Sequence, residues 1–254
     1  MKKSLIIANW KLNGNKYFIN DYIKKLLYEI NKNKINNVII APPLIYLQKI
    51  IEKLKNSNIK VCAQNVDINL FGAFTGEISV AMLKDIGVKY VLIGHSERRI
   101  NHNENDEIIY KKFKIVKENN LIPILCIGET YNEKKNGKTK EVCYNQINYI
   151  IKKMGIKVLE NCIIAYEPVW AIGKDISINY LEIQKIHKFI RSKIYLYDKK
   201  ISKEIVIQYG GSVTDKNIKE LLIQPDINGV LVGNSSLNFD IFLKIIKFSK
   251  NFQN

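Results

Sequence analysis

The sequence predicts an α/β protein, a (β/α)8 barrel in which eight parallel strands are surrounded by outer helices. Eight short apolar segments are spread over the 254 residues. They lack the strict alternation of half-exposed strands, which is typical of parallel strands buried on both faces. A segment with helical spacing of apolar residues follows each of them. Eight such units close naturally into a barrel.

The strands are expected where an apolar segment ends at a polar residue, a glycine or a proline. Pro42 and Pro168 each end one strand, because proline has no N–H to donate to a sheet ladder. The expected strands are residues 5–10, 38–41, 59–63, 90–93, 122–127, 162–166, 205–208 and 229–232.

The first expected helix has the clearest pattern, since apolar residues recur at positions i, i+3, i+4 and i+7 between Ile19 and Ile30. A long loop is expected over 65–78, and a short helix starts after His95. Further helices are expected near 44–55, before Ile86, and around 104–119, 143–154, 183–194, 215–223 and 239–246.

An open, doubly wound sheet is the alternative for a chain that alternates strands and helices. Such a sheet normally has a glycine-rich first turn, and G-x-G-x-x-G does not occur here. The P-loop motif G-x-x-x-x-G-K-[ST] is absent too. No low-complexity linker interrupts the alternation, and α/β barrels of this length fold as one unit. We therefore expect a single (β/α)8 barrel domain over residues 1–254.

The net charge of +16 comes almost entirely from lysine, because the chain has only the arginines Arg98, Arg99 and Arg191. Proteins that read nucleic acids rely on arginine for bidentate contacts. Lysine, asparagine and isoleucine are enriched along the whole chain, so a general compositional bias explains the charge. We expect no nucleic-acid partner, although a basic surface can steer anionic substrates.

Two further observations restrict the class of protein. No run of about 18 apolar residues occurs, and the apolar segment near the start is too short for a signal peptide. We therefore expect no membrane partner and a cytoplasmic location. The four cysteines form no C-x-x-C pair and no Cys/His cluster. Three of them lie inside apolar runs and are expected to be core thiols. We expect no disulfide framework, no metal and no cofactor.

Polar residues gather where the expected strands end. In a barrel of this kind the chemistry lies at the C-terminal ends of the strands. The set contains one carboxylate placed to act as a base, one imidazole, one cation and two glycine-rich turns: Asn9, Lys11, Gln64, Asn65, His95, Ser96, Glu97, Glu167, Gly210-Gly211-Ser212 and Gly233-Asn234. The turns after the seventh and eighth strands are the usual phosphate site of such barrels. The convergence predicts acid–base chemistry on a small phosphorylated substrate.

Six segments, in order along the whole chain, resemble the signature segments of the triosephosphate isomerase family. The strongest is Ala165-Tyr166-Glu167-Pro168-Val169-Trp170-Ala171-Ile172-Gly173. The others are Asn9-Trp10-Lys11, Cys62-Ala63-Gln64-Asn65, Gly94-His95-Ser96-Glu97-Arg98-Arg99, Pro123-Ile124-Leu125-Cys126-Ile127-Gly128-Glu129 and Tyr209-Gly210-Gly211-Ser212. The resemblance implies the TIM-barrel fold and interconversion of dihydroxyacetone phosphate and D-glyceraldehyde 3-phosphate, a step of glycolysis and gluconeogenesis.

The resemblance also implies the catalytic roles. Glu167 would be the base that moves a proton between neighbouring carbons, and His95 the neutral electrophile at the carbonyl oxygen. Lys11 would supply positive charge to the phosphate and the developing oxyanion. Asn9 would bind the substrate, and Glu97, next to Ser96, is expected to pair with Lys11.

Phosphate binding and assembly are implied in the same way. The phosphate would lie on the backbone amides of Gly173, Ser212, Gly233 and Asn234, under a loop at 168–176 that closes and excludes water. A loop around Thr75 resembles the dimer loop of the family, which implies a homodimer in which Thr75 reaches the partner's site.

The chain departs from the family pattern at two places. Lys174-Asp175-Ile176-Ser177 stands where the family usually has Thr, Gly, Lys, Thr, so the rate of loop closure is open. Asn234 stands where the family usually has a second glycine, and Asn tolerates left-handed backbone angles better than most residues.

Other functions remain as alternatives. Another phosphate-binding barrel enzyme, such as a phosphosugar lyase or epimerase, has a similar site. A Schiff-base lyase needs a lysine buried in mid-strand, which the expected strands lack. A glycosidase would need two acids, for which Glu167 and Glu97 are candidates, but the phosphate turns argue against a neutral sugar. A non-catalytic anion-binding protein would bind phosphate without exchanging protons.

Overall fold

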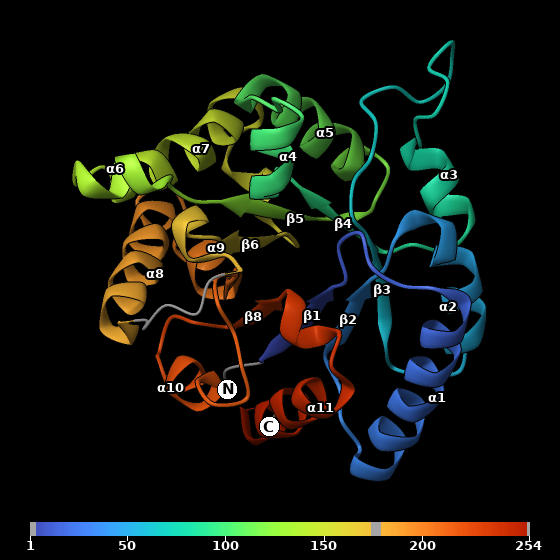
Figure 1. Ribbon diagram of the computed structural model, residues 1–254. Coiled ribbons are helices and arrows are strands. Elements are labelled where there is room, and N and C mark those ends of the chain that lie inside the picture. The colour runs from blue at the N-terminus through green and yellow to red at the C-terminus, as the bar shows by residue number, and fades with distance from the viewer. Residues whose placement is uncertain (1–3, 174–178, 253–254) are drawn as a thin grey trace.

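Eight parallel strands form a closed barrel in the computed structural model, which describes residues 4–173 and 179–252. Each strand pairs with its neighbours in chain order, and β1 pairs with β8 to close the ring (Figure 1). The strands are β1 (Leu5–Asn9), β2 (Val38–Ala41), β3 (Lys60–Ala63), β4 (Tyr90–Ile93), β5 (Ile122–Ile127), β6 (Ile163–Tyr166), β7 (Val206–Tyr209) and β8 (Gly229–Val232).

All eight expected strands are confirmed, four of them with the same bounds and the others within one residue. The first strand ends at Asn9 rather than at Trp10. The chain turns there because Lys11 has a positive φ of 51°, a backbone conformation that residues other than glycine seldom adopt. The expected closed barrel is therefore the observed architecture, and the open sheet is excluded.

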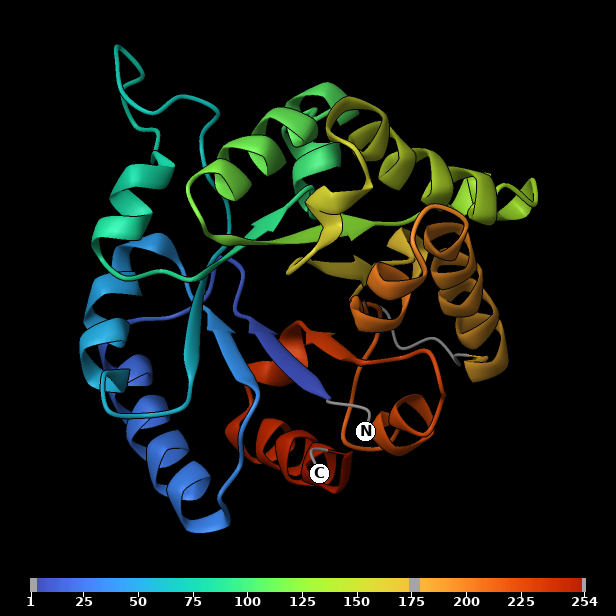
Figure 2. The ribbon, with the colours of Figure 1, turned by 180° about the vertical axis from the view of Figure 1, so that it is seen from behind.

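The helices form an outer ring around the barrel, as the two opposite views show (Figures 1 and 2). They are α1 (Lys16–Asn33), α2 (Leu47–Leu54), α3 (Val80–Asp85), α4 (Ser96–Asn101), α5 (Asp106–Glu118), α6 (Tyr131–Lys135), α7 (Thr139–Met154), α8 (Tyr180–Tyr195), α9 (Lys199–Glu204), α10 (Ile218–Leu222) and α11 (Phe239–Ser249). Short 3-10 helices are η1 (Leu44–Tyr46), η2 (Ile156–Leu159), η3 (Val169–Ala171), η4 (Asn234–Ser236) and η5 (Lys250–Phe252).

Two short helices were not expected from the sequence, α6 and α9. Each begins with a side-chain cap, from Thr130 and Asp198 respectively, and neither has enough residues to show an apolar stripe. The sequence predicts that His102 and His187 lie on helices, and this is wrong for His102. His102 does not lie on a helix but follows the end of α4, whereas His187 lies on α8 as expected.

The core has two layers, one on each face of the sheet. Because both faces of each strand are buried, its sequence is a continuous apolar run. The inner layer fills the barrel and includes Ile7, Leu92, Cys62 and Cys126. The outer layer lies between the strands and the helices and includes Cys143 and Cys162. All four thiols are buried, which confirms the expectation for the three in apolar runs. None of the helices described is long and apolar enough to cross a membrane.

Candidate active site

One cavity of about 410 Å³ brings together eight of the expected site residues at the C-terminal ends of the strands. They come from β1, from the turns after β4, β7 and β8, and from the segment after β6: Asn9, Lys11, His95, Glu167, Gly173, Ser212, Gly233 and Asn234. Residues more than 200 positions apart in the sequence therefore face the same space.

Glu167 follows β6 directly, and its side chain is only 2% exposed. Its Oε2 accepts a hydrogen bond from the Ser96 N–H at 3.1 Å, and its Oε1 lies 3.3 Å from His95 Nε2. Gly210 leaves space for this side chain, since a Cβ at that position would lie 2.8 Å from Glu167 Cγ. The carboxylate is thus held in one place at the wall of the cavity.

His95 precedes α4 and caps its start. Its Nδ1 accepts a hydrogen bond from the backbone N–H of Glu97 at 3.2 Å. A ring nitrogen that accepts cannot carry a proton, so the proton of a neutral imidazole lies on Nε2. That nitrogen faces Glu167 and the cavity. The arrangement presents a neutral donor to whatever the cavity binds.

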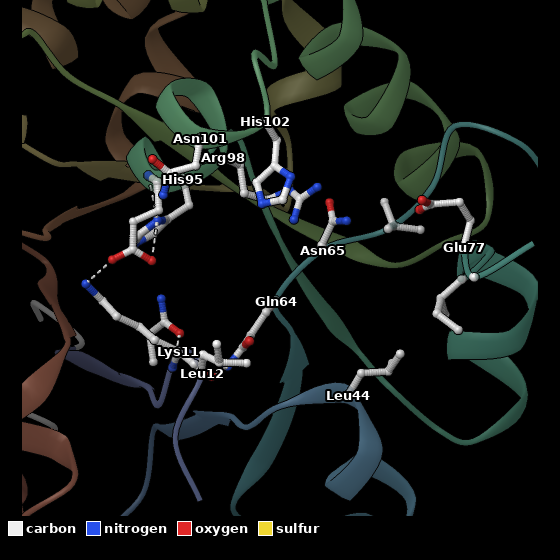
Figure 3. A pocket seen from close by; sticks show the side chains of 15 residues that line it. Lys11, Leu12, Leu44, Gln64, Asn65, Glu77, His95, Arg98, Asn101 and His102 are labelled. Carbon is white, nitrogen blue, oxygen red and sulfur yellow. Dashed lines mark hydrogen bonds and ion pairs between the residues drawn. The ribbon is translucent and has the colours of Figure 1, made fainter.

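Lys11 is held in its unusual backbone conformation by neighbours on both sides. Its N–H donates to Asn9 Oδ1 at 3.0 Å, and its carbonyl accepts from Gln64 Nε2 at 2.9 Å. Its Nζ lies 2.6 Å from Glu97 Oε1, so the expected ion pair is confirmed (Figure 3). A strained backbone maintained in this way commonly marks a functional position.

The two glycine turns form another part of the cavity wall. Ser212 follows β7, and Gly233 connects β8 to η4. Asn234 opens η4, so the left-handed conformation considered for it is not used. Lys11 adjoins this wall, since its Cε would lie 3.5 Å from a Cβ placed on Gly233. A cation and backbone turns at the same position suit an oxyanion.

The segment after Glu167 is anchored by Trp170, whose partners the sequence did not indicate. Its indole N–H donates to Glu129 Oε1 at 2.8 Å, and Lys134 Nζ lies 3.3 Å from the centre of its ring. Glu129 also accepts from the Tyr166 hydroxyl, and burial raises the pKa of its carboxyl. The departure at Lys174 and Asp175 lies outside the described residues.

A buried charged cluster behind α4 was also missed. Glu104 Oε1 accepts from Arg98 at 2.5 Å and from Lys112 at 2.6 Å, and Lys112 also donates to Asn65 at 2.8 Å. Burial alone would raise the pKa of Glu104, but the two cations hold it below its ordinary value. In the sequence, only the segments Cys62–Asn65 and Gly94–Arg99, which contain Asn65 and Arg98, pointed to this region.

Thr75, which is expected to reach the partner's site, does not line the cavity of its own chain. It lies in the loop between β3 and α3, which stands out from the barrel (Figure 1). Thr75 is exposed there. Ser96 and Glu97 contact the site residues Glu167 and Lys11 without lining the same cavity.

The fold and the site define a (β/α)8-barrel enzyme with acid–base groups and an anion-binding wall at the C-terminal ends of its strands. The sequence matches the family model described as Triosephosphate isomerase over residues 4–249. It is 51% identical over 253 residues to a triosephosphate isomerase of Buchnera aphidicola subsp. Schizaphis graminum, covering 99% of this chain and 100% of the relative. A triosephosphate isomerase of Wigglesworthia glossinidia brevipalpis is 53% identical over 248 residues, covering 96% and 95%. The chain belongs to the triosephosphate isomerase family.

Proposed function

We propose that this chain interconverts dihydroxyacetone phosphate and D-glyceraldehyde 3-phosphate by proton transfer through an enediolate. The observation that carries the proposal is the cavity that Glu167, His95 and Lys11 line together with two glycine turns. Full-length membership of the family supports it.

Glu167 acts as the base. It removes a proton from the carbon next to the carbonyl and returns it to the neighbouring carbon, because one carboxylate oxygen can reach both. The hydrogen bond from the Ser96 N–H holds the carboxylate at the wall of the cavity. When this bond breaks, the carboxylate is free to approach the substrate.

His95 and Lys11 stabilise the charge that develops on the enediolate. The Nε2–H of neutral His95 donates to the carbonyl oxygen, and its Nδ1 stays fixed by Glu97. Lys11 adds positive charge near both that oxygen and the phosphate, while Asn9 holds the backbone turn that presents it. Preorganised donors of this kind stabilise the transition state more than the bound substrate.

The phosphate binds to the backbone amides of Gly173, Ser212, Gly233 and Asn234, which line the cavity. Closure of the segment after Glu167 would exclude water and strengthen the electrostatic interactions. It would also keep the enediolate planar, so that phosphate is not eliminated.

The test is a coupled isomerase assay on the purified chain with D-glyceraldehyde 3-phosphate. We expect kcat/KM near the diffusion ceiling of about 10⁸ M⁻¹s⁻¹. A folded protein whose kcat/KM is several decades lower would point to another phosphorylated substrate.

We also propose that the chain is one barrel domain, acts in the cytoplasm and assembles as a homodimer. A second cavity, of about 390 Å³, adjoins the first and shares Asn9, Lys11 and His95 with it (Figure 3). Leu12 beside it is 96% exposed, and Phe71 in the protruding loop is 87% exposed. A second copy would cover both, with its Thr75 entering this cavity.

Thr75→Arg tests the dimer, because a charged side chain at the loop tip cannot enter the cavity without loss of hydration. We expect sedimentation to show monomers and the isomerase rate to fall. Asn56→Arg, at an exposed position between α2 and β3, is the matched control and should keep both properties. A fully active monomer at assay concentration would refute the dimer proposal.

A further inference from the structure

One buried hydroxyl connects α1 to the turn that follows β8. Tyr22 is 2% exposed, and its Oη donates to the carbonyl of Ser236 at 2.7 Å. Ser236 is the last residue of η4 and is fully buried. Its N–H and its Oγ both donate to the Gly233 carbonyl, at 2.8 and 2.7 Å. The turn from Gly233 to Ser236 is therefore one hydrogen-bonded unit, and Tyr22 holds that unit from behind.

The ring of the same tyrosine packs against the end of β1. Its centroid lies 5.1 Å from that of Trp10, with the two planes at 74°. Trp10 is fully buried and stands between Asn9 and Lys11 in the sequence. Phe18 and Phe239 pack on Tyr22 as well, at 5.3 and 5.4 Å. One side chain thus contacts both the strand end that carries the cation and the turn that carries the proposed phosphate amides.

The hydroxyl is the part of Tyr22 that packing alone does not explain. Aromatic rings surround the Tyr22 side chain, and a phenylalanine ring would fill the same space. A buried tyrosine hydroxyl needs a hydrogen-bond partner, and a buried carbonyl that loses its donor is left unpaired. Burial also raises the pKa of Tyr22 well above its ordinary value, so the hydroxyl keeps its proton. Its donation fixes where η4 lies relative to the aromatic cluster.

The position of η4 matters because Lys11 and the Gly233–Asn234 turn are both proposed to bind the phosphate. Lys11 Cε would lie only 3.5 Å from a Cβ on Gly233, and both line the cavity with Asn234. A small shift of the turn would move the amides of Gly233 and Asn234 away from the anion that Lys11 attracts.

We propose that Tyr22 is a positioning residue, which holds the Gly233–Asn234 turn in place beside Lys11 so that both bind the phosphate of the substrate. The proposal deepens the proposed function and rests on it for the identity of that phosphate. Tyr22 itself touches no substrate, so its effect is confined to binding of the phosphate group.

The variant Tyr22→Phe removes the hydroxyl and keeps the ring. We expect its KM for D-glyceraldehyde 3-phosphate and its Kd for inorganic phosphate, measured by titration calorimetry, to rise about two- to twelvefold, the range that one neutral hydrogen bond accounts for. Its kcat should change far less. Its kcat/KM for D-glyceraldehyde, which carries no phosphate, should equal that of the unsubstituted chain.

Tyr149→Phe is the matched control. It removes a tyrosine hydroxyl that donates to Glu107 at 2.6 Å on the outer helices, away from both turns. We expect its KM and its phosphate Kd to be unchanged.

Unchanged KM and phosphate Kd in Tyr22→Phe would overturn the proposal. An equal loss of activity toward D-glyceraldehyde would overturn it too, because a general loosening of the structure would then explain the effect. The phosphate titration needs no turnover, so it decides the role of Tyr22 even if the unsubstituted chain failed the isomerase assay.

Discussion

Two parts of the cavity are held in position by different means: the part proposed for acid–base chemistry, the acid–base half, and the part proposed to bind the phosphate, the phosphate half. Around β4 and β6, Glu167 and His95 are fixed by backbone N–H groups of Ser96 and Glu97, which follow His95 directly in the chain. Around β1 and β8, the turn at Gly233 is fixed by a helix more than 200 residues away. The first half is positioned by a short segment, and the second depends on how distant elements pack.

This difference matters for the effect of substitutions. In the acid–base half, replacing a reacting group removes chemistry without disturbing the segment that holds it. In the phosphate half, we expect a substitution of Tyr22, which does not line the cavity, to move the turn that does. Of the three variants that follow, Glu167→Gln and Gly210→Ala test the acid–base half, and Glu104→Gln tests the buried ion pairs at α4. Tyr22→Phe tests the phosphate half.

The largest effect is expected for Glu167→Gln. The amide keeps the shape of the side chain but cannot accept the substrate proton, so kcat should fall by about 10²- to 10⁴-fold. KM should change little, because the phosphate half is untouched. The measurement is steady-state kinetics with D-glyceraldehyde 3-phosphate, and a kcat close to that of the unsubstituted chain would show that another group is the base.

A smaller loss is expected for Gly210→Ala, which removes no reacting group but displaces one of them. The new Cβ would lie 2.8 Å from Glu167 Cγ, so the carboxylate must move. A displacement of about 1 Å can reduce the rate about 10²-fold. We expect kcat to fall and thermal unfolding to change little. Normal kinetics would mean that the carboxylate does not need this position.

The smallest effect on the rate is expected for Glu104→Gln, which acts on stability instead. The change leaves Arg98 and Lys112 without their shared carboxylate and should cost about 3–5 kcal/mol, as when one partner of a buried ion pair is lost. We expect denaturant unfolding at neutral pH to show this loss, with kcat nearly unchanged.

The same variant has a defined pH signature. Because the folded pKa of Glu104 lies below its ordinary value, its stabilisation is present above the unfolded pKa and is lost as the pH falls through the folded pKa. The difference in stability between the unsubstituted chain and Glu104→Gln should therefore shrink in acid. A difference that stays constant with pH would contradict the role of the charge.

The barrel was predictable because each strand is a short apolar run and each connection is local. The positions of Glu167 and His95 were also predictable, since both residues lie at strand ends within distinctive segments. The partners of Trp170, the cluster at Glu104 and the hydrogen bond of Tyr22 were not. Each of these interactions joins residues whose spacing in the sequence follows neither the helix nor the strand period. In the sequence, Tyr22 is only one of the apolar residues on the buried face of α1.

The pairing of β1 with β8 has a consequence for the synthesis of the chain. The turn at Gly233 is synthesised more than 200 residues after Lys11. At about 5–20 residues per second, more than ten seconds of translation separate the two. A nascent chain therefore has no complete phosphate site until its final strand has left the ribosome. Free triose phosphate can stabilise only the finished barrel, and truncated chains gain nothing from it.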